Sequence, residues 1–178
     1  MFTVSEIEGR RTGNAIYCLS GHFIAVFNRT IRARSGAHLR ALMERASQNE
    51  GEERPARFCT KCGAATISAC QHCQTKFEYR FVGDRPSYCG GCGKALPWTE
   101  AALSAAREYT EELSQLNEIE KTNLNRIIVD LTSETERTPL AVNRFKVFMT
   151  KIGPSAATIL TETIKAVVSE AAKKMLGL

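Results

Sequence analysis

The feature that most constrains this chain is the placement of its seven cysteines. All of them lie between Cys18 and Cys92, and the rest of the 178-residue chain has none. An odd count argues against a closed disulfide framework. Six of the cysteines form three CxxC pairs, which are Cys59/Cys62, Cys70/Cys73 and Cys89/Cys92. Because a CxxC turn aims two thiolates at one point, each pair supplies half of a tetrahedral zinc site.

The second and third pairs have the spacing of a zinc ribbon, with 15 residues between Cys73 and Cys89. In that interval aromatic residues alternate with charged ones before a Gly-Asp turn, which predicts a β-hairpin. The aromatic positions are Phe77, Tyr79 and Phe81. A hairpin between two CxxC turns would bring their four cysteines together.

The first CxxC pair needs a partner, and Cys18 with His22 can supply it. The eight ligands then divide between two zinc ions, one held by four cysteines and one by three cysteines and the histidine. They are Cys18, His22, Cys59, Cys62, Cys70, Cys73, Cys89 and Cys92. An alternative joins the first and second CxxC pairs and leaves Cys18 and His22 to the third. The hairpin favours the first arrangement. Cys18 also fits a buried structural thiol, and His22 a surface or ligand-supporting histidine.

Residues 99–178 have helical patterns throughout. Thr99 is expected to cap a first helix, and Asn117 followed by Glu120 predicts a capping box that starts a second. Thr138-Pro139 predicts the start of a third helix, which Gly153-Pro154 would end. An apolar stripe then predicts one last helix. Its members are Ile159, Leu160, Ile164, Val167, Val168, Ala171 and Leu176.

The expected fold is therefore α+β. Residues 1–98 would form a small double zinc-ribbon module with an inserted helix near residues 36–48, and residues 99–178 an all-α domain of about four helices.

The charge is uneven along the chain. Residues 1–98 carry a formal +6 and residues 99–178 a formal −1, which suggests nucleic-acid binding by the front half. Seven thiolates and two zinc ions would reduce that +6 to +3. The candidate nucleic-acid contacts are Arg29, Arg32, Arg34, Lys76 and Arg80. The aromatic residues of the expected hairpin could stack on bases, or could instead cover the helical half.

The chain has no run of the roughly 18 apolar residues that a transmembrane helix needs. Its first residues contain no apolar segment and no cleavage site of a secretory signal. We therefore expect a cytoplasmic protein without membrane attachment, in a compartment where thiols stay reduced.

Three motifs resemble a bacterial family of small zinc-ribbon proteins that is known only as a domain of unknown function. They are CLxGH at residues 18–22, CxxCG at residues 59–63 and PSYCxxCGKxxPWTE at residues 86–100. The resemblance covers about residues 18–102 and extends more loosely into the helices. The spacer between the first two motifs is longer here. The resemblance implies zinc and a bacterial origin, and it implies no activity.

No HExxH, GxSxG or P-loop pattern occurs in the sequence. We expect a non-catalytic interaction, adaptor or regulatory protein whose C-terminal helices bind a protein partner or a second copy of the chain. Nucleic-acid binding is the first alternative. The second is a zinc enzyme in which water replaces one ligand, for instance His22.

Overall fold

The computed structural model describes residues 12–30, 56–78 and 85–178. The chain divides into two compact units, residues 1–94 and 95–178. The helix expected near residues 36–48 lies outside the described residues, and so do Tyr79 and Phe81 of the expected hairpin.

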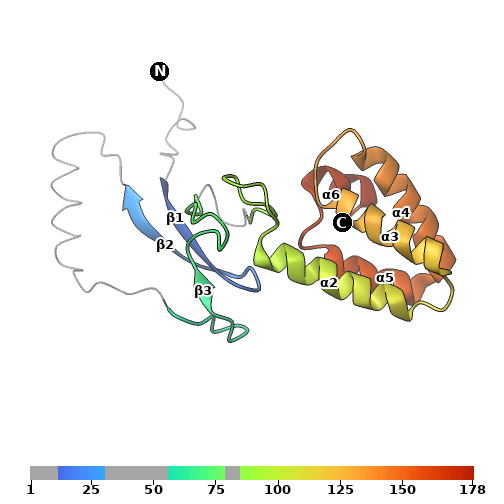
Figure 1. Ribbon diagram of the computed structural model, residues 1–178, viewed down its shortest axis with the longest axis horizontal. Coiled ribbons are helices and arrows are strands. Elements are labelled where there is room, and N and C mark those ends of the chain that lie inside the picture. The colour runs from blue at the N-terminus through green and yellow to red at the C-terminus, as the bar shows by residue number, and fades with distance from the viewer. Residues whose placement is uncertain (1–11, 31–55, 79–84) are drawn as a thin grey trace, which may run out of the picture. The chain divides into compact units, whose positions relative to one another are not determined.

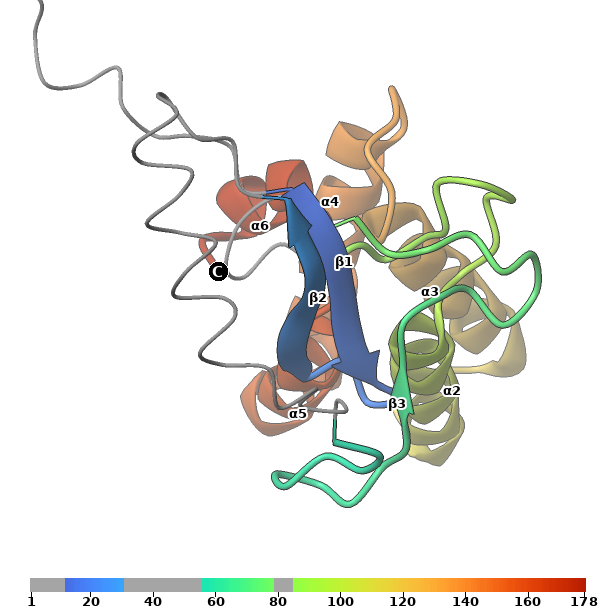
Figure 2. The same ribbon diagram turned by 90° about the vertical axis from the view of Figure 1, so that its left-hand side faces the viewer.

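The first unit contains a three-stranded antiparallel sheet. Its strands are β1 (Thr12–Cys18), β2 (Phe23–Thr30) and β3 (Thr66–Ile67). The order is β2-β1-β3, so β1 lies in the middle (Figure 2). Strands β1 and β2 form a hairpin on the two sides of the Cys18–His22 turn.

Few apolar side chains are buried among the described residues of this sheet unit. Tyr17 lies at its centre, with its ring edge-on to Phe23 at 5.9 Å and to Phe77 at 5.8 Å between ring centroids. Apart from cysteines, the buried hydrophobic side chains described in this unit are Ala15, Ile16, Tyr17 and Phe77. Four of its cysteines are buried as well, so sulfur forms a large part of this core.

The second unit is helical, as expected. Its helices are α2 (Pro97–Glu112), α3 (Glu118–Leu131), α4 (Thr138–Ile152), α5 (Pro154–Ile164) and α6 (Glu170–Leu176). Helix α4 packs against α3, α5 and α6, and α2 packs against α3 and α5 (Figure 1). None of these helices is long and apolar enough to cross a lipid bilayer.

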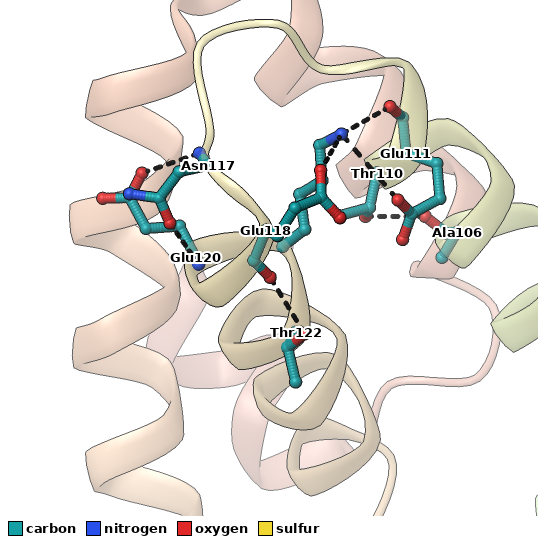
Figure 3. A network of polar contacts seen from close by, with 8 residues as sticks. Ala106, Thr110, Glu111, Asn117, Glu118, Glu120 and Thr122 are labelled. Carbon is teal, nitrogen blue, oxygen red and sulfur yellow. Dashed lines mark hydrogen bonds and ion pairs between the residues drawn. The ribbon is translucent and has the colours of Figure 1, made fainter.

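The turn from α2 to α3 shows why the sequence predicts this unit well. Asn117 Oδ1 accepts from the amide N–H of Glu120 at 3.0 Å, and Glu120 Oε2 accepts from the amide N–H of Asn117 at 3.1 Å (Figure 3). This reciprocal pair confirms the predicted capping box. Lys121 Nζ donates to the Glu111 carbonyl at 2.9 Å and so ties the end of α2 to the start of α3.

One large apolar core fills the helical unit, with Phe145 and Leu131 among its fully buried side chains. All five helices contribute to it. The buried hydrophobic positions from α3 onward are Leu124, Ile127, Ile128, Leu131, Ala141, Val142, Phe145, Ile152, Leu160, Ile164, Val167, Val168 and Ala172.

The single last helix of the prediction is two helices, so the unit has five helices where about four were expected. Val167 and Val168 are both buried, in the turn between α5 and α6. The Val167 and Val168 amides both donate to the Ile164 carbonyl, at 2.9 and 3.1 Å, which closes the end of α5. The Ser169 amide instead donates to the Leu131 carbonyl at 2.9 Å, and the Ser169 hydroxyl accepts from the Ala172 amide at the start of α6.

Candidate metal centres

The three CxxC turns share one backbone geometry. In each turn the first cysteine's carbonyl accepts from the amide four residues later, and its own amide donates to the carbonyl five residues later. In the third turn, for example, the Gly93 amide donates to the Cys89 carbonyl at 2.8 Å, and the Cys89 amide donates to the Lys94 carbonyl at 2.8 Å. The backbone of each CxxC turn is held by hydrogen bonds between residues at most five positions apart, which explains why a short motif predicts the turn.

The same turns direct amide groups at the sulfur atoms. The Cys59, Cys70 and Cys89 sulfurs each accept from the amide two residues later at 3.4 Å. The Cys18 sulfur accepts from the His22 amide at 3.2 Å. Donors aimed at sulfur favour the thiolate, which is the form that binds metal.

One position of each turn has a left-handed backbone. Gly63 and Gly93 occupy it in the first and third turns, each with φ +71°, and Gln74 occupies it in the second with φ +61°. Gln74 is the only described residue other than glycine with positive φ. A side chain is disfavoured there by about 1–2 kcal/mol, so the second turn carries backbone strain that its two counterparts avoid.

Strand pairing assembles the first cluster, which consists of Cys18, His22, Cys59 and Cys62. Strand β3 follows the first CxxC turn in the chain, and its Thr66 pairs with Cys18 at the end of β1. The Leu19 amide adds a bond to the Ala65 carbonyl at 3.0 Å. These long-range bonds place the Cys59–Cys62 turn beside the Cys18–His22 turn.

The second cluster consists of Cys70, Cys73, Cys89 and Cys92. Its two turns approach closely at Gly91, where an added Cβ would lie 2.1 Å from Thr75 Oγ1. Glycine therefore leaves room for the Thr75 side chain, whose hydroxyl is 3.1 Å from the Cys73 sulfur. The two clusters have the ligand pairing that the expected hairpin favoured. The alternative, in which the first and second CxxC pairs share one site, does not occur.

The donor atoms of both clusters fit a tetrahedral zinc ion. The Cys18–Cys62, Cys70–Cys92 and Cys73–Cys89 sulfur pairs are 3.7, 3.8 and 3.6 Å apart. His22 Nδ1 is 3.5 Å from the Cys18 sulfur and 3.7 Å from the Cys59 sulfur. Zinc–sulfur bonds of about 2.3 Å and zinc–nitrogen bonds of about 2.0 Å give tetrahedral edges of about 3.8 Å and 3.6 Å.

The cysteines are not disulfide-bonded. All seven are free, and their sulfur separations far exceed the roughly 2.05 Å of a disulfide bond. In each cluster the four ligand atoms lie within 4.8 Å of one another, so each group can hold one metal ion. Thiolate and imidazole donors in fours favour zinc.

Hydrogen bonds favour the thiolate form of the exposed Cys62 and Cys73. The amide N–H of Ala64, followed by the Ser20 hydroxyl, lowers the pKa of Cys62 to about 6. In the second cluster the Thr75 hydroxyl and then its amide N–H lower the pKa of Cys73 to about 6. These groups therefore prepare one exposed sulfur in each cluster for metal binding.

Crowding acts in the opposite direction at two other sulfurs. Burial raises the pKa of Cys18. At Cys92 the Lys94 amide has the largest single effect and lowers the pKa, but burial and the neighbouring sulfurs together raise the pKa to about 11. A divalent cation among the sulfurs would relieve this repulsion between thiolates.

Residues 38–176 match the model of one protein family, described as an uncharacterised protein conserved in bacteria (DUF2321). This chain belongs to the DUF2321 family. The family is the uncharacterised bacterial one that the sequence motifs indicated. No protein of curated function matches the chain, and no solved structure matches it.

The matched residues of this DUF2321 protein contain the three CxxC pairs and all five described helices. Cys18 and His22 precede residue 38, so their place in the first cluster follows from strand pairing and distances alone.

The candidate nucleic-acid residues are only partly described. Lys76 is exposed. Arg29 is in β2, but its side chain is outside the description, as are Arg32, Arg34 and Arg80 entirely. Phe77 is buried against Tyr17 and is therefore unavailable to stack on a base.

Sequence reasoning missed several residues that support the clusters. Ser20 and Thr75 contact exposed cysteine sulfurs. Thr75 lies two residues after the second cysteine of its CxxC pair, as Ala64 does in the first pair, and this shared position is only a weak sequence signal for a residue that contacts sulfur. Arg85 reaches the first cluster from a distant part of the chain, and no local pattern marks it.

Proposed function

We propose that this DUF2321 protein is a non-catalytic interaction, adaptor or regulatory protein, in which two structural zinc ions stabilise the N-terminal unit and the helical unit binds a partner. The observation that carries the proposal is the geometry of the two clusters, each with four protein ligand atoms within 4.8 Å of one another. Four protein ligands are typical of structural zinc, whereas a catalytic zinc keeps a position for water.

The small apolar core of the sheet unit supports a structural role for the metal. With four buried hydrophobic side chains besides cysteine, the described part of the unit has little hydrophobic driving force of its own. Zinc binding then supplies folding free energy, because the four ligands converge only in the folded chain.

The partner is proposed to bind the helical unit through α4. Leu140 and Val147 are 47% and 70% exposed and lie seven residues apart, which places them on one face. The apolar stripe of the last predicted helix is mostly buried in the unit's own core, since Leu160 and Ile164 are fully buried.

Nucleic-acid binding is the second candidate, favoured by exposed cations near the CxxC turns. These are Arg57, Lys61, Lys76 and Lys94. The clusters would carry net negative charge, −1 for three thiolates and −2 for four, which these cations partly offset. The burial of Phe77 removes one of the expected stacking platforms.

Metal analysis combined with X-ray absorption at the zinc edge tests the structural role. We expect two zinc ions per chain, one with four sulfur ligands and one with three sulfurs and a nitrogen. An oxygen ligand on either ion would contradict the proposal and favour the enzyme alternative, because water would then hold a coordination position.

Two binding measurements separate the partner classes. Sedimentation equilibrium would show self-association that Val147→Glu abolishes and Asn123→Glu, a control at an exposed polar position of α3, leaves intact. Titration with single-stranded DNA and RNA at low salt is expected to show no binding. Tight binding that weakens steeply with salt would replace the protein-partner proposal with the nucleic-acid one.

A further inference from the structure

Arg85 is close to one cluster in the chain and contacts the turn that carries part of the other. It lies four positions before Cys89 of the second cluster in the chain, yet its guanidinium contacts the Cys18–His22 turn of the first cluster. Arg85 Nη1 donates to the Gly21 carbonyl at 3.5 Å, in the turn between Cys18 and His22. The side chain is half-buried, so this contact is partly shielded from water.

The Gly21 carbonyl belongs to the peptide group that leads directly into His22. That turn is otherwise closed by local bonds, from the Gly21 amide to the Cys18 carbonyl at 2.8 Å and from the Cys18 amide to the His22 carbonyl at 3.0 Å. Gly21 has φ +80°, a conformation that glycine adopts easily and also leaves easily. A guanidinium on its carbonyl therefore restrains the backbone from which the His22 ring projects.

Charge points in the same direction. Burial lowers the pKa of Arg85, while Tyr17 and Cys18 act electrostatically to raise it. A partly desolvated cation is stabilised by nearby negative charge. A zinc ion held by three thiolates and a neutral imidazole leaves a net charge of −1 beside this guanidinium, and three neutral thiols and a neutral imidazole without metal would leave none.

We propose that Arg85 is a positioning residue of the first metal centre, and that through Arg85 the first centre binds metal more tightly when the second is loaded. Only three residues separate Arg85 from Cys89, so metal at the second centre fixes the segment from which Arg85 extends. The inference rests on the proposed function, because it requires both clusters to bind metal.

Titration of the full chain with Co²⁺ tests the positioning role. The visible spectrum of Co²⁺ distinguishes a three-sulfur, one-nitrogen site from a four-sulfur site, so both sites can be followed in one sample. Loss of a group that supports metal ligands typically weakens binding about 10–100-fold. We expect Arg85→Gln to weaken the first site by at least about 10-fold. The affinity of the second site should stay unchanged while the first site is empty, because coupling between the two sites acts in both directions only once both are loaded.

Two further variants separate charge from geometry. Arg85→Lys keeps the positive charge but loses the planar fork, so we expect it to recover part of the lost affinity. Arg57→Gln removes one exposed positive charge from the same unit and is expected to leave the first site unchanged. A first site weakened equally by Arg57→Gln and Arg85→Gln would overturn the inference, because only net charge would then matter.

The coupling is tested by emptying the second site. We expect Cys92→Ser to weaken the first site in the parent chain and to weaken it much less in an Arg85→Gln background, so that the two effects are not additive. In the unmutated chain, the spectrum of the four-sulfur site should develop before or together with that of the mixed site. A mixed site that fills first and with unchanged affinity in Arg85→Gln overturns the inference.

The remaining outcomes separate this inference from the proposed function. Equal weakening of both sites by Arg85→Gln would show a general structural role and overturn the inference, while two-site metal binding would still support structural zinc. A parent chain that binds no metal at either cluster would overturn the proposed function itself.

Discussion

The two units of this protein are stabilised in different ways. In the sheet unit, buried sulfur atoms stand where a larger domain would have aliphatic side chains, and Ala15, Ile16, Tyr17 and Phe77 are the buried hydrophobic residues described beside them. In the helical unit, five helices bury a continuous set of leucine, isoleucine, valine and phenylalanine side chains.

Because of this difference, substitutions should affect the stability of the two units differently. The helical unit gains free energy from about 25 cal/mol per Å² of buried apolar surface, spread over many residues. In the sheet unit we expect stability to depend on the eight side chains that could hold metal. A single loss there therefore matters more than a single loss in the helices.

The largest expected effect is that of metal removal. Structural zinc contributes about 10–16 kcal/mol in small zinc modules, so a strong chelator should unfold the sheet unit of the full chain and leave the helical unit folded. Amide NMR spectra would show the loss of dispersed peaks from residues 12–30, 56–78 and 85–94 alone, with recovery after zinc is returned. Simultaneous loss of the helical peaks would contradict the view that only the sheet unit depends on metal.

A cavity in the helical core is expected to have the next largest effect. Phe145 is 1% exposed, so Phe145→Ala should cost about 3–5 kcal/mol of unfolding free energy. Denaturant unfolding followed by helical circular dichroism would measure it, with the exposed Val147→Ala as the control. Zinc content should stay unchanged, and a fall in zinc content would show that the sheet unit depends on the helical core.

A smaller effect is expected at the left-handed position of the CxxC turns. Gln74→Gly should stabilise the sheet unit by about 0.5–1 kcal/mol, because it removes the strain of a side chain at φ +61°. Gly93→Ala should destabilise it by about 1 kcal/mol, although the added methyl meets no atom within 4 Å. Zinc-loaded samples compared in denaturant would show both shifts, and equal stabilities would mean that the metal overrides the backbone preference.

The smallest effect concerns Glu120 at the start of α3. Its carboxylate accepts from Lys151 and from the Asn117 amide, which lowers the pKa of Glu120 below its usual value. A lowered carboxyl pKa stabilises the folded state above the unfolded pKa of about 4.3. That contribution is lost as the pH falls through the folded value.

Melting temperatures of the parent chain and Glu120→Gln between pH 7 and pH 3 would test this dependence. The parent should be slightly more stable at pH 7, and the two curves should converge below about pH 4. Glu136→Gln, at an exposed position of the α3–α4 loop, serves as the control. If the melting temperatures of the parent and Glu120→Gln differ by the same amount at every pH, the ionised Glu120 carboxylate makes no pH-dependent contribution to stability.

The sequence correctly predicted helix starts and stops that depend on interactions between neighbouring residues. The Asn117–Glu120 capping box and the stop at Gly153-Pro154 are each decided by hydrogen bonds or backbone geometry within a few residues, and both are present. Thr99 was expected to cap α2, but the helix begins at Pro97 with Leu96 as its N-cap, and Thr99 is fully buried in the first turn. Its hydroxyl looked like a cap because the sequence does not reveal that burial.

Long-range contacts decided the rest. The break between α5 and α6 depends on the Leu131 carbonyl, 38 residues before Ser169 in the chain. The position of Arg85 at the first cluster likewise depends on Gly21, which lies 64 residues earlier. No periodicity or motif records such contacts.

The sequence by itself determined that each CxxC pair would present two sulfurs to one point, because both ligands lie within one hydrogen-bonded turn. Only the tertiary structure decided which half-site meets which. The pairing of β3 with the end of β1 brings Cys59 and Cys62 to Cys18 and His22. That choice depends on contacts between segments some 40 residues apart, where chain spacing constrains geometry only weakly.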